Sequence, residues 1–316
     1  MLRFSALVSA AVLASSALAA SVKSRQTNDG IHLAISPTCG QLGGAYTNVN
    51  AGIDLGSVKT IVSFGDSYTD GGKHDGSPLL PAVLIPPSPR AGGRVTNGPV
   101  WVEGVASDAG ATLMDYAISG AVVNVSLWAS AAGQHDFVEE MATFLGQSNV
   151  LDPDTTLYTV FFGINDFSDS HTDGNHLPEA AAEILEQIQI LSSPPTNGRS
   201  FLVTDVYGRG TIAATGEAFK QQIFDGLGTL RKDTGLNVAF VNFEELWDGV
   251  LGPTPGFAAF GYASDGYCVE LNATTTDGAC DDPEHTFYWL HGHPSKETHR
   301  IMADFVEDAL TNCRVA

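Results

Sequence analysis

Four short segments of the sequence carry groups that can act together on a carbonyl carbon. Ser67 can supply a nucleophilic hydroxyl, and His293 can act as the base that removes its proton. Asn165 carries a side-chain amide, and Gly120 lets its backbone N–H approach a substrate closely. Two such donors suit the negative oxygen that forms when a serine attacks an ester. Each segment alone also has a structural explanation, as a turn, a strand end or a histidine of the core.

Three of these residues, Ser67, Gly120 and Asn165, follow predicted strands. Five apolar runs of strand length occur over residues 60–64, 113–118, 157–162, 201–206 and 238–243, the second being the weakest. Ser67, Gly120 and Asn165 follow the first, second and third runs. Continuous apolar runs are typical of parallel strands buried on both faces, and such sheets bind ligands at the carboxyl ends of their strands.

Amphipathic stretches alternate with these runs. Apolar side chains recur at helical spacing over 137–145 and 219–230, Pro178 can open another helix, and Ser295 can cap the last one. Alternation of strands and helices predicts an α/β fold, with a central parallel sheet between two layers of helices. We expect a single domain over 53–316, preceded by an N-terminal arm over 21–52.

Composition and charge exclude several classes of protein. The chain has 316 residues, of which 43% are hydrophobic and 16% charged, which predicts a globular protein with a large core rather than a disordered one. Its 15 basic and 36 acidic residues give a net charge of −21. We therefore do not expect nucleic acids or anionic membranes as partners, and we expect a neutral substrate.

The N-terminal segment has the features of a secretion signal. Residues 1–20 contain an early Arg3, an apolar run and an Ala17-Leu18-Ala19 ending that suits signal peptidase. No later run reaches the ~20 apolar residues that cross a bilayer. We therefore expect a secreted protein, and the sequons at Asn124 and Asn272 are consistent with a glycoprotein.

Four cysteines in a secreted chain can form two disulfides in three ways. Cys268 and Cys280 bracket a polar loop and are expected to pair, which leaves Cys39 and Cys313 to join the N-terminal arm to the last helix. The cysteines and histidines are scattered, so the spacing indicates no metal site, and no cofactor is expected.

Taken together, the four segments resemble the SGNH (GDSL-type) hydrolase superfamily. Its Gly-Asp-Ser, Gly-x-Asn-Asp and His-Pro blocks have counterparts here in the same chain order, and the resemblance runs from about Ile53 to Cys313. The stretches AGIDLGSVKTIVSFGDSYTDGG and RVTNGPVWVEGVA are similar to secreted fungal members grouped with carbohydrate esterase family 16.

The resemblance implies a flavodoxin-like three-layer α/β/α fold and a serine esterase that needs no cofactor. Ser67 would be the nucleophile and His293 the base, while the backbone N–H groups of Ser67 and Gly120 and the Asn165 side chain would bind the oxyanion. The expected substrate is a short-chain acyl ester, chiefly acetyl, of a plant-derived oligosaccharide, and the expected state is a monomer. The alternative is a lipase or phospholipase for longer acyl chains, with the segment 78–90 as a candidate lid.

One departure from the superfamily pattern concerns the orientation of the base. The superfamily carries an aspartate three residues before the histidine, where this chain has Leu290. The ring could instead be oriented by a backbone carbonyl, by Asp282 or by Glu284. A catalytically silent, carbohydrate-binding relative is a further alternative, because loss of the orienting group from a working triad costs about 10⁴-fold in rate.

The remaining candidates have secondary roles. His291 is the competing base, whereas His299 is expected to be a surface or structural residue. Activity should rise with pH as His293 loses its proton, near pH ~6.5 or higher if the acidic surface raises its pKa.

Asp66, Asp70 and Asp166 are expected to brace turns, and Trp101 and Trp128 to pack in the core rather than line a sugar platform.

Overall fold

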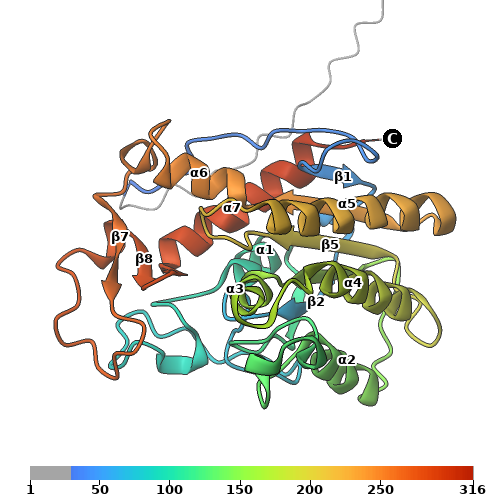
Figure 1. The fold of residues 1–316 in the computed structure, drawn as a ribbon, viewed down its shortest axis with the longest axis horizontal. Helices are drawn as coiled ribbons and strands as arrows, with labels where there is room; N and C mark the ends of the chain where they lie inside the picture. Colours follow the sequence, from blue (N-terminus) through green and yellow to red (C-terminus); the bar gives the residue numbers. More distant parts are fainter. Residues whose placement is uncertain (1–29, 316) are drawn as a thin grey trace, which may run out of the picture.

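The computed structural model describes residues 30–315, and the predicted signal segment 1–20 lies outside the described residues. Its centre is a six-stranded sheet in the order β1-β6-β5-β4-β2-β3 (Figure 1). The strands are β1 (Val49–Ala51), β2 (Thr60–Gly65), β3 (Thr112–Asp115), β4 (Thr156–Phe161), β5 (Ser200–Asp205) and β6 (Asn237–Asn242). Strands β2 to β6 are parallel, as the sequence predicts. The sixth strand, β1, was not predicted; it comes from the N-terminal arm and pairs antiparallel with β6.

In the described part of the chain, seven α-helices connect or flank the strands. They are α1 (Trp101–Ala109), α2 (Phe137–Gly146), α3 (Ile164–Asp173), α4 (Leu177–Ser192), α5 (Ala214–Thr234), α6 (Glu244–Leu251) and α7 (Lys296–Asn312). The predictions for α2, α4, α5 and α7 are confirmed: Pro178 lies in the first turn of α4, and the Ser295 side chain accepts a hydrogen bond from the Thr298 N–H at the start of α7. Within residues 30–315, no helix has the length and apolar character needed to cross a bilayer.

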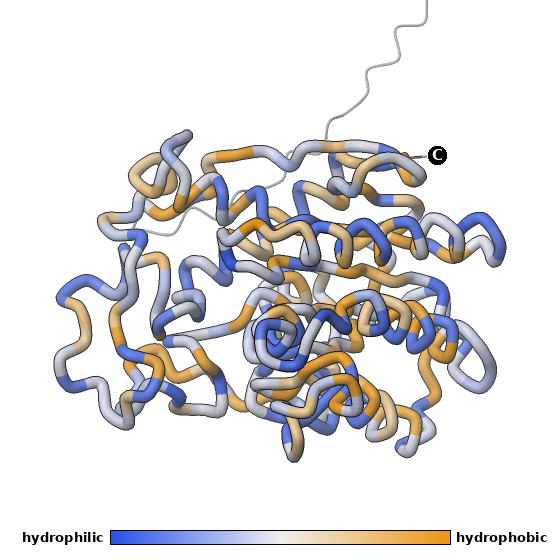
Figure 2. Tube along the Cα trace, in the orientation of Figure 1, coloured by the Kyte–Doolittle hydropathy of each residue, from blue (hydrophilic) through white to orange (hydrophobic). Residues whose placement is uncertain are grey.

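Side chains from both faces of the sheet are buried, as continuous apolar strands require. In β2, Val62 joins the core on the side of α2, α4 and α5, whereas its neighbour Ile61 joins the core on the side of α1, α6 and α7. The same alternation recurs in β4, where Tyr158 and Leu157 belong to opposite cores. Hydrophobic residues accordingly recur along the strands and helices in Figure 2, while the end of α5 at the right of the picture is hydrophilic. This is the predicted three-layer α/β/α arrangement.

A second, smaller sheet was not predicted. It consists of β7 (Ser264–Val269), β8 (Thr286–Leu290) and β9 (His293–Pro294) in the order β7-β8-β9. Strands β7 and β8 lie at one end of the molecule, at the left of Figure 1. The small sheet bears the predicted base, because its last strand begins with His293.

Both predicted disulfides are confirmed. Cys268 and Cys280 close the loop between β7 and β8, and Cys39 joins the arm to Cys313 at the end of α7. Together with the β1–β6 pairing, the second bridge fixes the arm to the main sheet.

Candidate active site

The strand order brings the predicted Ser67, Gly120 and Asn165 segments to the same edge of the sheet. Strand β2 lies between β3 and β4, so the loops that leave these three strands are neighbours. Ser67 is the second residue after β2, and Asn165 lies in the first turn of α3, directly beyond β4. The loop before Gly120 is tied to β2, since the Ile118 N–H donates to the Gly65 carbonyl at 3.0 Å.

His293 reaches Ser67 from the second sheet. The Ser67 Oγ lies 3.0 Å from the His293 Nε2, which is hydrogen-bonding distance. The Tyr68 hydroxyl donates to the Gly292 carbonyl at 2.7 Å and so joins the turn that bears the serine to the turn that bears the histidine. Ser67 is only 8% exposed. A hydroxyl in contact with an imidazole, in a largely covered position, is the arrangement that nucleophilic catalysis by serine needs.

The far ring nitrogen of His293 faces a backbone carbonyl. Its Nδ1 lies 3.3 Å from the His291 carbonyl oxygen, a long hydrogen bond. The two carboxylates considered from the sequence have other partners: Asp282 bonds the nearby His285, and Glu284 bonds Lys296. Of the three possible orienting groups, the geometry therefore favours the backbone carbonyl.

Leu290 has a packing role. Its side chain is fully buried in a small apolar cluster that includes Val95, Val269 and Trp289. The position of the usual aspartate is thus filled by a core residue of the second sheet.

The surroundings of His293 lower its pKa to about 4. Burial of the ring is the main cause, and the positive charges of Arg209 and then Arg90 add to it; the His291 carbonyl acts in the opposite direction. The expectation that the acidic surface raises this pKa is therefore wrong. Local desolvation and two nearby guanidinium groups outweigh the net charge of the chain.

His291 and His299, the two other histidines considered from the sequence, have other contacts. The His291 ring is exposed and contacts the Tyr267 ring edge-on, with centroids 4.8 Å apart. His299 is 1% exposed, and its Nδ1 accepts a hydrogen bond from the Trp101 N–H at 3.2 Å. Burial lowers the pKa of His299 to about 3. His299 is thus structural and not on the surface.

Gly120 and Asn165 belong to the loops that follow β3 and β4, on either side of the strand that leads to Ser67. Gly120 has a φ of 87°, a left-handed conformation that favours glycine. The Asn165 Nδ2 donates one hydrogen bond to the Ala121 carbonyl at 2.8 Å, which fixes the amide beside the Gly120 loop. An amide NH₂ has two donors, so one remains for a substrate.

Buried carboxylates brace the loops of the site. Asp70 accepts hydrogen bonds from the Ser119 N–H and hydroxyl, and Asp66 accepts one from the Tyr68 N–H. Asp166 accepts from the Val123 N–H and the Trp128 indole. The predicted bracing role of the three aspartates is confirmed. Trp101 and Trp128 are fully buried in the two cores, as predicted.

Sequence reasoning missed Glu140, which lies 1% exposed beneath the site. Its two oxygens accept hydrogen bonds from the Gly65 and Ile118 N–H groups, both at 3.0 Å, and so link the loops before Ser67 and Gly120. The available signal was a carboxylate on the apolar face of a helix, three residues after Phe137 and four before Phe144.

Arg209 was missed as well. It follows β5 in the loop Gly208-Arg209-Gly210, and its Nη1 donates to the Gly292 carbonyl at 3.3 Å. The rule that singled out Ser67 and Asn165, a polar residue in the loop just beyond a strand, also describes this position.

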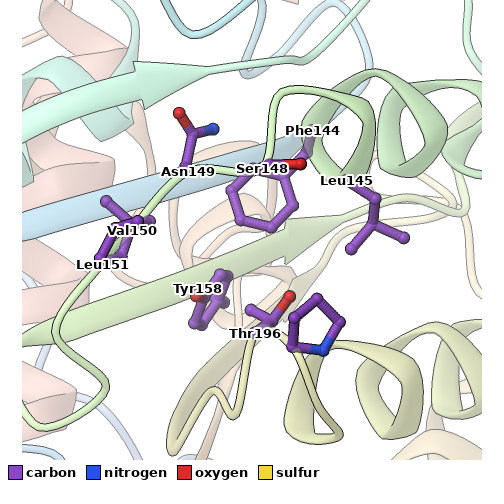
Figure 3. A pocket seen from close by; sticks show the side chains of 9 residues that line it. Phe144, Leu145, Ser148, Asn149, Val150, Leu151, Tyr158 and Thr196 are labelled. Carbon is purple, nitrogen blue, oxygen red and sulfur yellow. The ribbon is translucent and has the colours of Figure 1, made fainter.

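A separate cavity lies far from these groups. It has a volume of about 230 Å³ and is lined by Phe144, Tyr158 and the loops over 148–151 and 195–196 (Figure 3). These loops precede β4 and β5, so the cavity is at the amino ends of the strands, opposite the site. Among residues 30–315, no three His, Cys, Asp or Glu side chains gather in a way that could hold a metal ion.

The chain is similar to several known proteins. Residues 61–306 match a family model described as GDSL-like Lipase/Acylhydrolase. The chain is 22% identical to the thermolabile hemolysin of Vibrio parahaemolyticus over 293 residues, which are 83% of this chain and 66% of that protein. It is 31% identical over 127 residues to an acetylesterase of Hypocrea jecorina, covering 35% of this chain and 36% of the relative.

Among solved structures, a family two carbohydrate esterase from Clostridium thermocellum in complex with cellohexaose is similar, at 15% identity and a TM-score of 0.48. The similarity covers 80% of this chain and 64% of that one. The chain thus spans less than two thirds of the length of each of these three relatives.

Proposed function

Because the chain belongs to the GDSL-like lipase/acylhydrolase family, we propose that it hydrolyses carboxylic esters through an acyl-enzyme on Ser67. The observation that carries the proposal is the 3.0 Å contact between the Ser67 Oγ and the His293 Nε2. This contact joins the two groups that a serine esterase needs, from segments 226 residues apart in the chain.

The reaction has two steps in this proposal. In the first, the Ser67 Oγ attacks the ester carbonyl, His293 takes the hydroxyl proton, and the same proton passes to the leaving alcohol as the C–O bond breaks. In the second, a water molecule loses a proton to His293 and attacks the acyl-enzyme, which releases the acid and restores Ser67. The N–H groups of Ser67 and Gly120 and the Asn165 amide stabilise the oxyanion in both steps.

His293 acts in a dyad, with the His291 carbonyl as the orienting acceptor. A neutral carbonyl holds the Nδ1–H tautomer, so that Nε2 is free to accept the serine proton. It stabilises the imidazolium less than a carboxylate does, which agrees with the lowered pKa of His293.

We propose short-chain acyl esters, chiefly acetyl esters of plant-derived carbohydrates, as the substrates. The name of the Hypocrea relative supports the acetyl group, and the net charge of −21 supports an uncharged polymer over a polyanion. The predicted signal peptide and the two disulfides support a secreted protein that acts outside the cell. We propose that it is a monomer.

A second candidate substrate class is an ester of a longer acyl chain. It is favoured by the loop over 78–90, where Leu80, Leu84 and Ile85 are 60%, 57% and 91% exposed. Trp289 on β8 holds the end of this loop through its indole N–H and the Pro89 carbonyl, which keeps the loop beside the sheet that bears His293. Large exposed apolar side chains gathered in one loop are a feature of surfaces that bind apolar ligands.

The test is turnover of p-nitrophenyl acetate by the wild type and by Ser67→Ala. The proposal requires that the substitution remove nearly all activity. Equal turnover by both proteins, or none by the wild type, would leave the catalytically silent, carbohydrate-binding alternative. The acetate to octanoate ratio of kcat/KM then distinguishes the two substrate classes, since a short-chain esterase loses activity as the chain grows.

A further inference from the structure

Arg209 presents a guanidinium group beside the predicted base. The residue has a φ of 49°, a left-handed conformation that is uncommon for any residue with a side chain. Its guanidinium lies against Gly292, the neighbour of His293, and donates to the Gly292 carbonyl at 3.3 Å. Backbone strain of this kind is typical of functional sites. The Tyr68 hydroxyl is a second hydrogen-bond partner of this guanidinium, and most of its five donors remain unused.

Arg90 lies on the same side of the site. It follows Pro89, whose carbonyl bonds the Trp289 indole on β8, and its Nη2 donates to the Leu271 carbonyl at 3.3 Å. Like Arg209, Arg90 forms no ion pair with a carboxylate among residues 30–315, although the chain has 36 acidic residues. Both arginines lower the pKa of His293, as positive charges near the ring do.

Several carboxyl groups lie in this neighbourhood, among them Asp66 and Asp265, but within residues 30–315 none of them forms an ion pair with either arginine. Asp66 is fully buried, and burial raises its pKa to about 7. Asp265 is exposed on β7. In the described part of the chain, the two guanidinium groups thus have no carboxylate partner, although the net charge of the protein is −21.

The position of the two arginines indicates which part of the substrate they face. In the proposed mechanism His293 gives its proton to the leaving alcohol, so groups beside His293 lie near the alcohol portion of the ester. The acyl portion faces the opposite side, where Gly120 and Asn165 receive the oxyanion. We propose that Arg209 and Arg90 bind one carboxylate on the alcohol portion of the ester, as an acylated uronic acid would carry.

This inference rests on the proposed esterase function and narrows its substrate class. A single carboxylate would be attracted by the two nearby guanidinium groups. A dense polyanion would in addition be repelled by the acidic residues over the rest of the surface. An ester with an isolated acidic sugar therefore fits the site better than a highly charged polymer does.

The experiment compares two acetyl esters of similar shape, 4-acetoxybenzoate and the uncharged 4-acetoxybenzamide, at neutral pH. The quantity measured is the ratio of their kcat/KM values, and comparison of this ratio between variants cancels the intrinsic reactivity of each ester. We expect the wild type to favour the anion, Arg209→Gln to lower the ratio about tenfold, and the exposed Arg90→Gln to lower it about threefold. Arg209→Lys should retain part of the preference.

Arg199→Gln is the matched control. Arg199 is exposed and pairs with Asp154 just before β5, at the opposite end of the strands, so its loss changes the net charge equally without touching the site. Its ratio should equal that of the wild type. Raising the salt from about 0.05 M to about 0.5 M should reduce the wild-type ratio, because the charges are partly exposed to solvent.

Two results would overturn the inference. One is an equal loss of kcat/KM on both esters in Arg209→Gln, which would mean that Arg209 only positions His293 through the Gly292 carbonyl. The other is a kcat/KM ratio for the two esters that stays the same in high salt and in Arg90→Gln. This second result does not depend on the folding of any Arg209 variant. Failure of the esterase proposal is distinguishable, because 4-acetoxybenzamide would then not be hydrolysed in a Ser67-dependent manner.

Discussion

The lowered pKa of His293 predicts an esterase that keeps its activity in acid. Only the neutral imidazole can accept the Ser67 proton, so kcat/KM rises with pH through the His293 pKa of the free enzyme. With a pKa of about 4, about nine-tenths of the histidine is neutral at pH 5. An ordinary histidine with a pKa of about 6.5 would be only about 3% neutral at that pH. The two cases differ about thirtyfold in activity at pH 5.

The assay is the release of acetic acid from phenyl acetate between about pH 3.5 and pH 8, with kcat/KM determined at each pH. The half-maximal point should lie near pH 4 in the wild type and should move upward in Arg209→Gln, because one of the positive charges that depress the pKa is lost. Arg199→Gln should leave it in place. A wild-type midpoint near pH 6.5 would refute the reasoning, since it would mean that neither burial nor the arginines act on the catalytic ring.

Three further predictions concern individual residues. Asn165→Ala should lower kcat about 100- to 1000-fold with little change in KM, measured by steady-state kinetics, and a variant with wild-type kcat would remove Asn165 from the oxyanion pocket. Leu290→Asp should lower the free energy of unfolding by at least about 3 kcal/mol in denaturant titrations, because it introduces a carboxyl into a filled apolar cluster. It should not raise kcat, and a stable, faster variant would contradict the assignment of the His291 carbonyl as the orienting group. Burial raises the pKa values of Asp66 and Asp205 to about 7. Below that pH the folded protein therefore binds more protons than the unfolded chain, and the free energy of unfolding falls as the pH rises through 7. The calorimetric Tm should therefore be lower at about pH 8.5 than at about pH 6.5, and an unchanged Tm would contradict this.

The helices and strands that could be predicted from the sequence are those with a clear residue pattern within the element itself. The parallel strands are continuous apolar runs, and α2, α4, α5 and α7 have apolar side chains at helical spacing, so each is recognisable without knowledge of its neighbours. Strand β1 has only three residues, Val-Asn-Ala, and owes its existence to pairing with β6. Strand β9 has two residues and depends on β8. Such strands are set by tertiary contacts that a single sequence does not display.

In the candidate site, too, the residues with a local sequence signal could be predicted, whereas features that depend on tertiary contacts could not. Ser67, Gly120 and Asn165 could be proposed because each follows a recognisable strand, and His293 because of its Pro neighbour before the last helix.

The group that orients His293 could not be chosen from the sequence, since a backbone carbonyl has no residue type. The error over the His293 pKa has a related cause. Net charge is read from composition, whereas desolvation and the two nearby guanidinium groups depend on the fold.

The most direct test of the central claim is covalent labelling with a serine-directed organophosphate, followed by mass spectrometry of the intact protein and its peptides. The account predicts one adduct per chain, located on Ser67, absent in Ser67→Ala and formed far more slowly in His293→Gln. An adduct on another residue, or ester hydrolysis that persists when Ser67 is fully labelled, would contradict it.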